Sequence, residues 1–130
     1  DSTANLDEEE VISISEDEKI ILFPNASAEE IRVEEVINYL NDLAEHLKAN
    51  PDDRVRVTGH ASRVGDPEEN MTYSRRRARR VKDMLTSRGV PEGQIETEWK
   101  GDTQLADPGT TEAAHRRNRR AVVKLMRSGN

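Results

Sequence analysis

Arginine is the residue type whose spacing most clearly indicates a binding function, in the run Arg75-Arg76-Arg77-Ala78-Arg79-Arg80. On a helix of 3.6 residues per turn, Arg77 and Asn70 lie on one flank of an apolar stripe. An arginine at the border of a core is partly desolvated and its guanidinium is oriented, which suits bidentate binding of a carboxylate or phosphate. The same position also suits pairing with a structural acid or extension past the edge of the core, so both interpretations stay open. The expected stripe consists of Met71, Ser74, Ala78, Val81 and Leu85.

The other arginines of this run, and those of 116–120, form two basic clusters that could follow a phosphate backbone. The chain has a net charge of −6, and residues 1–69 hold 19 acidic but only 6 basic side chains. An acidic half opposes approach to a polyanion, and four aromatic residues give no platform for stacking bases. We therefore expect no nucleic-acid partner, internal pairing of the arginines with the acidic half, and a solvated face at Arg76, Arg79 and Arg80.

The three histidines, His46, His60 and His115, do not have the spacing of a metal-binding motif. His60 follows an expected strand and could serve as a base, but no activated nucleophile accompanies it. The segment 59–65, GHASRVG, lacks the Gly-Lys-Ser/Thr ending of a phosphate loop, and the chain has no cysteine. We expect a non-enzymatic protein without a cofactor or metal, in which His60 orders its loop.

Two amphipathic helices are expected to position these side chains. Residues 33–49 repeat apolar positions every three or four residues until Asn50-Pro51 ends the pattern. A second helix is expected from about Glu68 to Arg88, closed by Gly89. Residues 101–114 are expected to form a polar loop.

Strands are expected at 11–14 and 19–23, as a hairpin, and at 54–58, 95–99 and 121–126. The predicted fold class is α/β, an α+β sandwich with a βαβαβ-type core and helices on one face of a small mixed sheet. We expect residues 1–10 to be an acidic tail or linker end and 11–130 to be a single domain. Leu, Ile, Val and Phe make up only 26 of 130 residues, so periodicity rather than composition indicates that the chain folds.

The ordered motifs Gly59-His60-Ala61-Ser62-Arg63-Val64-Gly65, Asn70, Tyr73-Ser74, Arg77-Ala78 and Asn118-Arg119-Arg120 resemble a known family. They are similar to the peptidoglycan-associating domain of outer-membrane protein A, Pal-type lipoproteins and MotB stator proteins. The resemblance covers about residues 19–127. It implies a bacterial periplasmic domain whose parent is an outer-membrane, lipoprotein or otherwise membrane-anchored envelope protein.

The resemblance also implies residue roles. Arg77 matches the arginine that binds the carboxylate of diaminopimelate in peptidoglycan stem peptides. Asn70 would line the pocket, Asn118 and Arg119 would border it, and His60 would belong to its wall. Ser62 and Pro24 stand where the family has acids that hold the ligand's ammonium group.

The loss of both acids leaves two functions open. The first is noncovalent peptidoglycan binding through Arg77, with Ser62 and Asn70 shaping the pocket. Asp66, Glu68 or Glu69 could replace the missing acids from another direction. The alternative is a domain that has lost diaminopimelate recognition and acts as a protein-interaction module. The oligomeric state and the preferred stem-peptide residue do not follow from the sequence.

Overall fold

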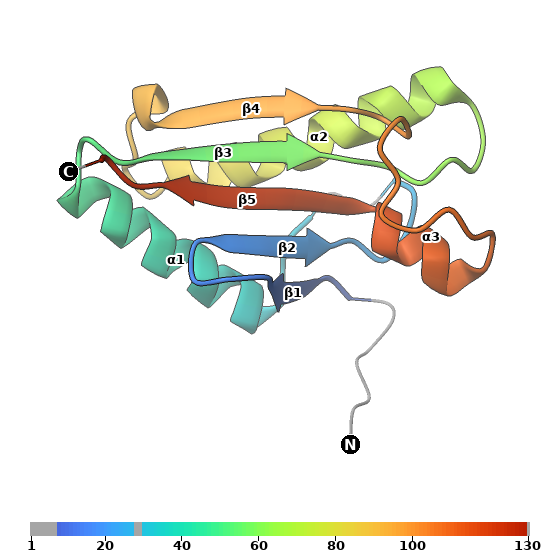
Figure 1. Ribbon diagram of the computed structural model, residues 1–130. Helices are drawn as coiled ribbons and strands as arrows, with labels where there is room; N and C mark the ends of the chain where they lie inside the picture. The colour runs from blue at the N-terminus through green and yellow to red at the C-terminus, as the bar shows by residue number, and fades with distance from the viewer. Residues whose placement is uncertain (1–7, 28–29, 130) are drawn as a thin grey trace.

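The computed structural model describes residues 8–27 and 30–129, in which five strands form one mixed sheet flanked by helices (Figure 1). The strands are β1 (Glu10–Ser13), β2 (Glu18–Leu22), β3 (Arg54–Gly59), β4 (Ile95–Trp99) and β5 (Arg120–Met126). The helices are α1 (Glu34–Ala49), α2 (Pro67–Thr86) and α3 (Glu112–Asn118), with a short 3₁₀ turn, η1, at Glu92–Gln94. The predicted fold class is confirmed.

The sheet order is β1-β2-β5-β3-β4, so the last strand of the chain lies at the centre. β5 is antiparallel to β2 and β3, whereas β3 and β4 are parallel. Consequently the carboxyl ends of β2, β3 and β4 lie at the same edge of the sheet as the start of β5, on the right in Figure 1. The segments that follow these strands therefore meet there.

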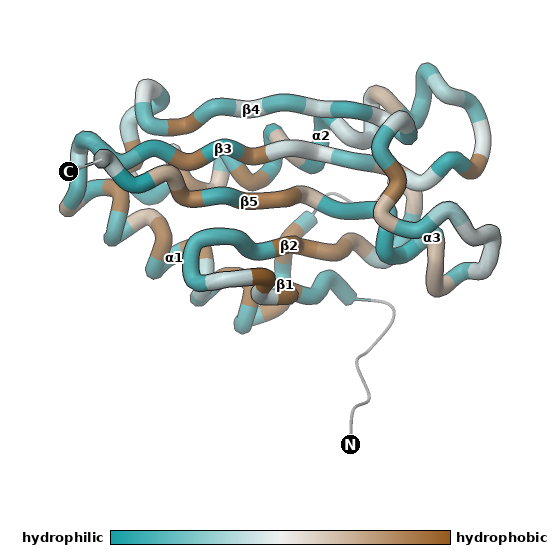
Figure 2. Tube along the Cα trace, in the orientation of Figure 1, coloured by the Kyte–Doolittle hydropathy of each residue, from teal (hydrophilic) through white to brown (hydrophobic). Residues whose placement is uncertain are grey.

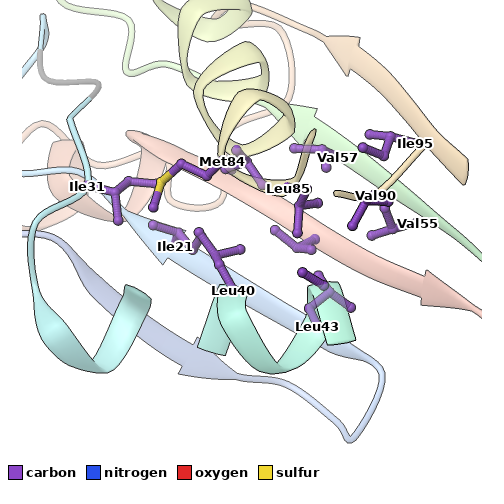
Figure 3. Packing of buried hydrophobic residues seen from close by; sticks show 14 of the residues in the cluster. Ile21, Ile31, Leu40, Leu43, Val55, Val57, Met84, Leu85, Val90 and Ile95 are labelled. Carbon is purple, nitrogen blue, oxygen red and sulfur yellow. The ribbon is translucent and has the colours of Figure 1, made fainter. Parts of the chain in front are cut away.

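α1 and α2 cover one face of the sheet, and the core lies between the helices and the strands (Figures 1 and 3). Figure 3 shows Leu40 and Leu43 of α1 facing Leu85 of α2, with Ile21, Val55 and Val57 of the sheet around them. Hydrophobic and hydrophilic residues alternate along β3 (Figure 2), because one side of the strand faces these helices and the other does not. The apolar periodicity of α1 and α2 therefore predicts the buried face of each helix, with the exception of Met71.

Two local expectations are wrong. Residues 112–114, the end of the loop expected over 101–114, belong to α3, whose N-cap Thr111 accepts a hydrogen bond from the Ala114 amide. Met71, expected in the buried stripe, is 39% exposed. It lies in the first turns of α2, towards the end of β4, where Gly101 packs against it.

The last residues of the acidic segment 1–10 belong to the folded domain. Glu10 begins β1, and the buried carboxylate of Glu9 accepts hydrogen bonds from the amides of Arg32 and Val33. Val33, the N-cap of α1, has no capping side-chain bond of its own. Glu9 therefore places a negative group at the amino end of α1. Residues 1–7 of the expected tail lie outside the described residues.

The close contact between α2 and β3 depends on Gly59. A Cβ placed on Gly59 would lie 1.8 Å from the backbone oxygen of Ser74, which cannot move without shifting the helix. We expect Gly59→Ala to lower the free energy of unfolding by at least about 2 kcal/mol through overpacking. Gly93→Ala is the matched control, because nothing lies within 4 Å of its added Cβ. Chemical denaturation of both variants checks this, and equal stabilities would contradict the packing described.

Candidate binding site

Arg77 lies completely buried beneath the carboxyl ends of β2 and β3, with 0% of its surface exposed. Its guanidinium donates to the backbone oxygen of His60 at 2.9 Å and to that of Asn25 at 2.9 Å. It also donates to the backbone oxygen of Ala26 and lies 5.5 Å from the centre of the Phe23 ring. The expectation of a border position is therefore wrong, because the segment after β2 covers the guanidinium.

These contacts join two parts of the chain that follow different strands. Asn25 and Ala26 come after β2, and His60 comes directly after β3. Backbone carbonyls are neutral acceptors with a partial negative charge, so they offset part of the cost of burying a cation. Arg77 thus fixes the edge of the sheet where the candidate residues gather.

Backbone hydrogen bonds hold His60 at this edge of the sheet. Its amide donates to the Arg120 oxygen at 2.8 Å, while its own oxygen accepts from Arg77. The residue is 4% exposed, and burial lowers the pKa of His60 to about 4, aided by the positive charges of Arg120 and Lys100. Among the described residues, its buried Nδ1 has no hydrogen-bond partner. His60 is therefore a neutral ring that orders its loop.

Asn70, in α2, and Ser62, in the segment between β3 and α2, are both buried at 2% exposure. The Asn70 side chain donates to Oδ2 of Asp102 at 3.2 Å. Asp102 is half-buried and follows Gly101, whose oxygen accepts from the Ala61 amide at 2.8 Å. Sequence reasoning missed Asp102. The feature of the sequence that could have indicated Asp102 is its position directly after Gly101, just beyond the carboxyl end of β4.

The alternative acids are placed less favourably for a ligand. Asp66 is the N-cap of α2 and accepts a hydrogen bond from the Glu68 amide. Glu68 and Glu69 are exposed in the first turn of that helix, where carboxylates favour the helix dipole. The Asp102 carboxylate, by contrast, accepts a hydrogen bond from the Asn70 side chain.

Asn118 and Arg119 organise the backbone around the site. The Asn118 amide oxygen accepts from the amides of Ala106 and Asp107, and its nitrogen donates to the Asp107 oxygen. Arg119 donates to the backbone oxygens of Phe23 at 3.2 Å and Pro24 at 2.8 Å, and to Glu112 at 2.6 Å. Both arginines, Arg77 and Arg119, therefore hold the segment that follows β2. Pro24 contributes a carbonyl to this arrangement.

The second basic cluster is largely used internally. Arg116 pairs with Glu10 at 3.2 Å, as expected for pairing with the acidic half. Arg117 and Arg119 instead pair with Asp107 and Glu112, acids of the second half. In the first cluster, Arg75, Arg76 and Arg79 are exposed on α2 and Arg80 is half-buried.

Within residues 8–27 and 30–129, no three histidine, aspartate or glutamate side chains are grouped so as to hold a metal ion. None of the helices there has the length and apolar character needed to cross a membrane.

The OmpA family model matches residues 27–119. This chain belongs to the OmpA family. The domains of this family are non-catalytic modules, in agreement with the prediction that the protein is not an enzyme.

Known proteins extend this assignment. The chain is 39% identical over 89 residues to the peptidoglycan-associated lipoprotein of Pasteurella multocida (strain Pm70), covering 68% of this chain and 59% of that protein. It thus spans about three fifths of the length of this curated relative. The crystal structure of the peptidoglycan-associated lipoprotein from Burkholderia pseudomallei superimposes with a TM-score of 0.77 at 24% identity, covering 82% of this chain and 89% of the other. The C-terminal domain of Helicobacter pylori MotB gives a TM-score of 0.72 at 21% identity, with 84% of each chain covered. At these identities the two structures show a shared OmpA-like fold.

The depressed pKa of His60 gives this OmpA-family domain a pH-dependent stability. An unfolded histidine binds a proton near pH 6.5, whereas folded His60 resists protonation until about pH 4. The contribution is complete above pH 6.5 and is lost as the pH falls towards 4. We expect the stability advantage of wild type over His60→Gln to shrink across this window, measured by denaturant titration at several pH values. The acids affect both proteins alike, so a constant difference would contradict a buried neutral His60.

Proposed function

We propose that this domain binds peptidoglycan noncovalently and anchors a longer bacterial envelope protein to the cell wall from the periplasmic side. Membership of the OmpA family and similarity to proteins named peptidoglycan-associated lipoproteins support this proposal. The parent protein would be associated with the outer membrane or otherwise anchored in the envelope. The observation that supports a ligand site is that two buried polar residues of α2 contact the segments after β3 and β4: Arg77 binds the His60 carbonyl, and Asn70 binds the Asp102 carboxylate.

Arg77 is proposed to bind the side-chain carboxylate of diaminopimelate in the stem peptide. Because the guanidinium is fully buried, the ligand must take the place of the Asn25 and Ala26 carbonyls while the bond to His60 remains. A carboxylate is a stronger acceptor for a guanidinium than a neutral carbonyl, and it matches the guanidinium fork with two oxygens. Binding by exchange of backbone acceptors for a ligand anion is therefore chemically favourable.

The ammonium group of diaminopimelate needs an acceptor, and Ser62 and Pro24 supply no charged one. We propose that Asp102 serves instead, because its carboxylate is half-buried beside Asn70. Asn70 would orient this acid through the 3.2 Å hydrogen bond, and Ser62 would add a hydroxyl. His60, Asn118 and Arg119 would keep the walls of the pocket in place.

A second function is favoured by the way in which Arg77 is held. Three backbone carbonyls and the Phe23 ring already give this guanidinium a structural role. With Ser62 and Pro24 in place of acids, the domain would then be a protein-interaction module that keeps the OmpA fold. Binding to a stem peptide distinguishes the two functions.

The most selective test changes the ligand and leaves the protein intact. Stem peptides with diaminopimelate or with lysine at position three differ by a single carboxyl group. We expect the diaminopimelate peptide to bind about 10-fold to 100-fold more tightly in calorimetry, since hydrogen bonds to a charged group contribute about 1.5–3 kcal/mol. Arg77→Lys keeps the charge but loses the fork, so it should remove this preference while circular dichroism and denaturation confirm folding. No binding of either peptide to folded wild-type protein would favour the interaction module.

A gain-of-function variant tests the ammonium side of the same pocket. Ser62→Asp restores an acid at the place where the family has one, and we expect it to strengthen binding of the diaminopimelate peptide by about tenfold. Thr103→Asp, an acid added at an exposed neighbouring position, is the control for added charge. Equal affinities for wild type and Ser62→Asp would contradict the location proposed for the ammonium group.

A further inference from the structure

A groove runs between α2 and β4, on a side of the helix that the candidate binding site does not use. It consists of two adjoining depressions of about 210 and 340 Å³ that share Arg75 and Trp99. The first also contains Arg79 and Lys82, and the second contains Met71. Trp99 is 42% exposed and Met71 39% exposed, so the groove presents two large apolar side chains as well as cations.

The charge of this groove is opposite to that of the whole chain. Arg75, Arg79 and Lys82 are spaced four and three residues apart and therefore lie along one side of α2. In the part of the chain that the structure describes, Arg75 and Arg79 form no ion pair, whereas Lys82 pairs with the exposed Glu92 at 3.3 Å. Glu68 is the acid at the far end of the groove. A chain of net charge −6 thus presents a row of cations here.

The other wall of the groove is an edge strand. β4 ends the strand order and, among the described strands, pairs with β3 alone; it forms the upper edge in Figure 1. The outer edge of such a strand offers backbone donors and acceptors to an added strand. Thr97 and Trp99 face the groove, whereas Glu96 and Glu98 face the other side of the sheet, towards Arg56 and Thr58. An incoming strand would therefore direct alternate side chains at the cations of α2.

We propose that the α2–β4 groove binds an extended acidic segment of a partner protein, added to the sheet as a strand beside β4. Arg75 to Lys82 spans about 10 Å along the helix, at 1.5 Å per residue. Three acids at alternate strand positions span about 13 Å, so flexible arginine and lysine side chains can reach all three. The site is independent of Arg77 and of the proposed peptidoglycan function.

Charge also decides between this partner and a second copy of the chain. Pairing two β4 edges would bring together the cationic rows of two α2 helices, and like charges disfavour that contact. An acidic segment instead meets Arg75 and Arg79, which have no internal acids to displace among the described residues. Complementarity therefore favours a partner with acids at every second residue.

The test uses the intact domain and a capped seven-residue peptide with glutamate at positions 2, 4 and 6 and threonine elsewhere. We expect NMR titration to shift the amides of Ile95–Trp99 and the Trp99 indole, and to slow hydrogen exchange on the outer edge of β4. A peptide of the same composition with its three glutamates contiguous should bind more weakly. Arg75→Glu/Arg79→Glu should weaken binding at least about tenfold.

Lys124→Glu is the control for a charge reversal outside the groove, to be compared with the single variant Arg75→Glu, because Lys124 is exposed on β5, two strands away from the groove. It should alter the affinity by less than about twofold. Three results would overturn the proposal. One is an equal loss of binding in Lys124→Glu. Another is binding that shifts α2 without protecting β4, which indicates a general polyanion site such as one for nucleic acid. The third is self-association that Arg75→Glu/Arg79→Glu abolishes, which indicates a second copy.

Discussion

A guanidinium without solvent contact imposes the main constraint on this OmpA-family domain. Burying the charge of Arg77 removes it from water, so acceptors must be supplied by the protein, and the carbonyls of Asn25, Ala26 and His60 do so. These acceptors belong to segments after β2 and β3. Gly59 lets α2 approach β3 closely enough for Arg77 to reach both. The packing of one helix on one strand thereby determines how the edge of the sheet is arranged.

Two sides of α2 contribute residues to two different surfaces of the domain. Arg77 and Asn70 face the ends of the strands, where a ligand carboxylate would compete with backbone carbonyls. Arg75 and Arg79 extend beside β4, where no described acid neutralises them. A single arginine-rich run therefore supplies a buried cation that orders the fold and exposed cations that are available to a partner. The difference depends on which neighbouring segment covers each side chain.

Much of this architecture could be predicted because apolar residues recur at regular intervals along its helices and strands. The alternation in 54–58 and the apolar spacing in 33–49 each report a buried face, and both elements form as expected. The seven-residue helix α3 was missed because it is too short and polar to show a periodic stripe. A helical wheel placed Arg77 at a border because the wheel contains no information on Asn25 and Ala26, 51 or more residues away. Asp102 was missed because its proximity to Asn70 arises from tertiary structure.

A crystal structure of the domain with a diaminopimelate muropeptide bound tests most directly whether Arg77 exchanges backbone acceptors for a ligand anion. We expect a ligand carboxylate on the Arg77 guanidinium in place of the Asn25 and Ala26 carbonyls, with the His60 carbonyl still bound and the ligand ammonium beside Asp102. A muropeptide bound elsewhere, with all three carbonyls still on Arg77, would contradict it.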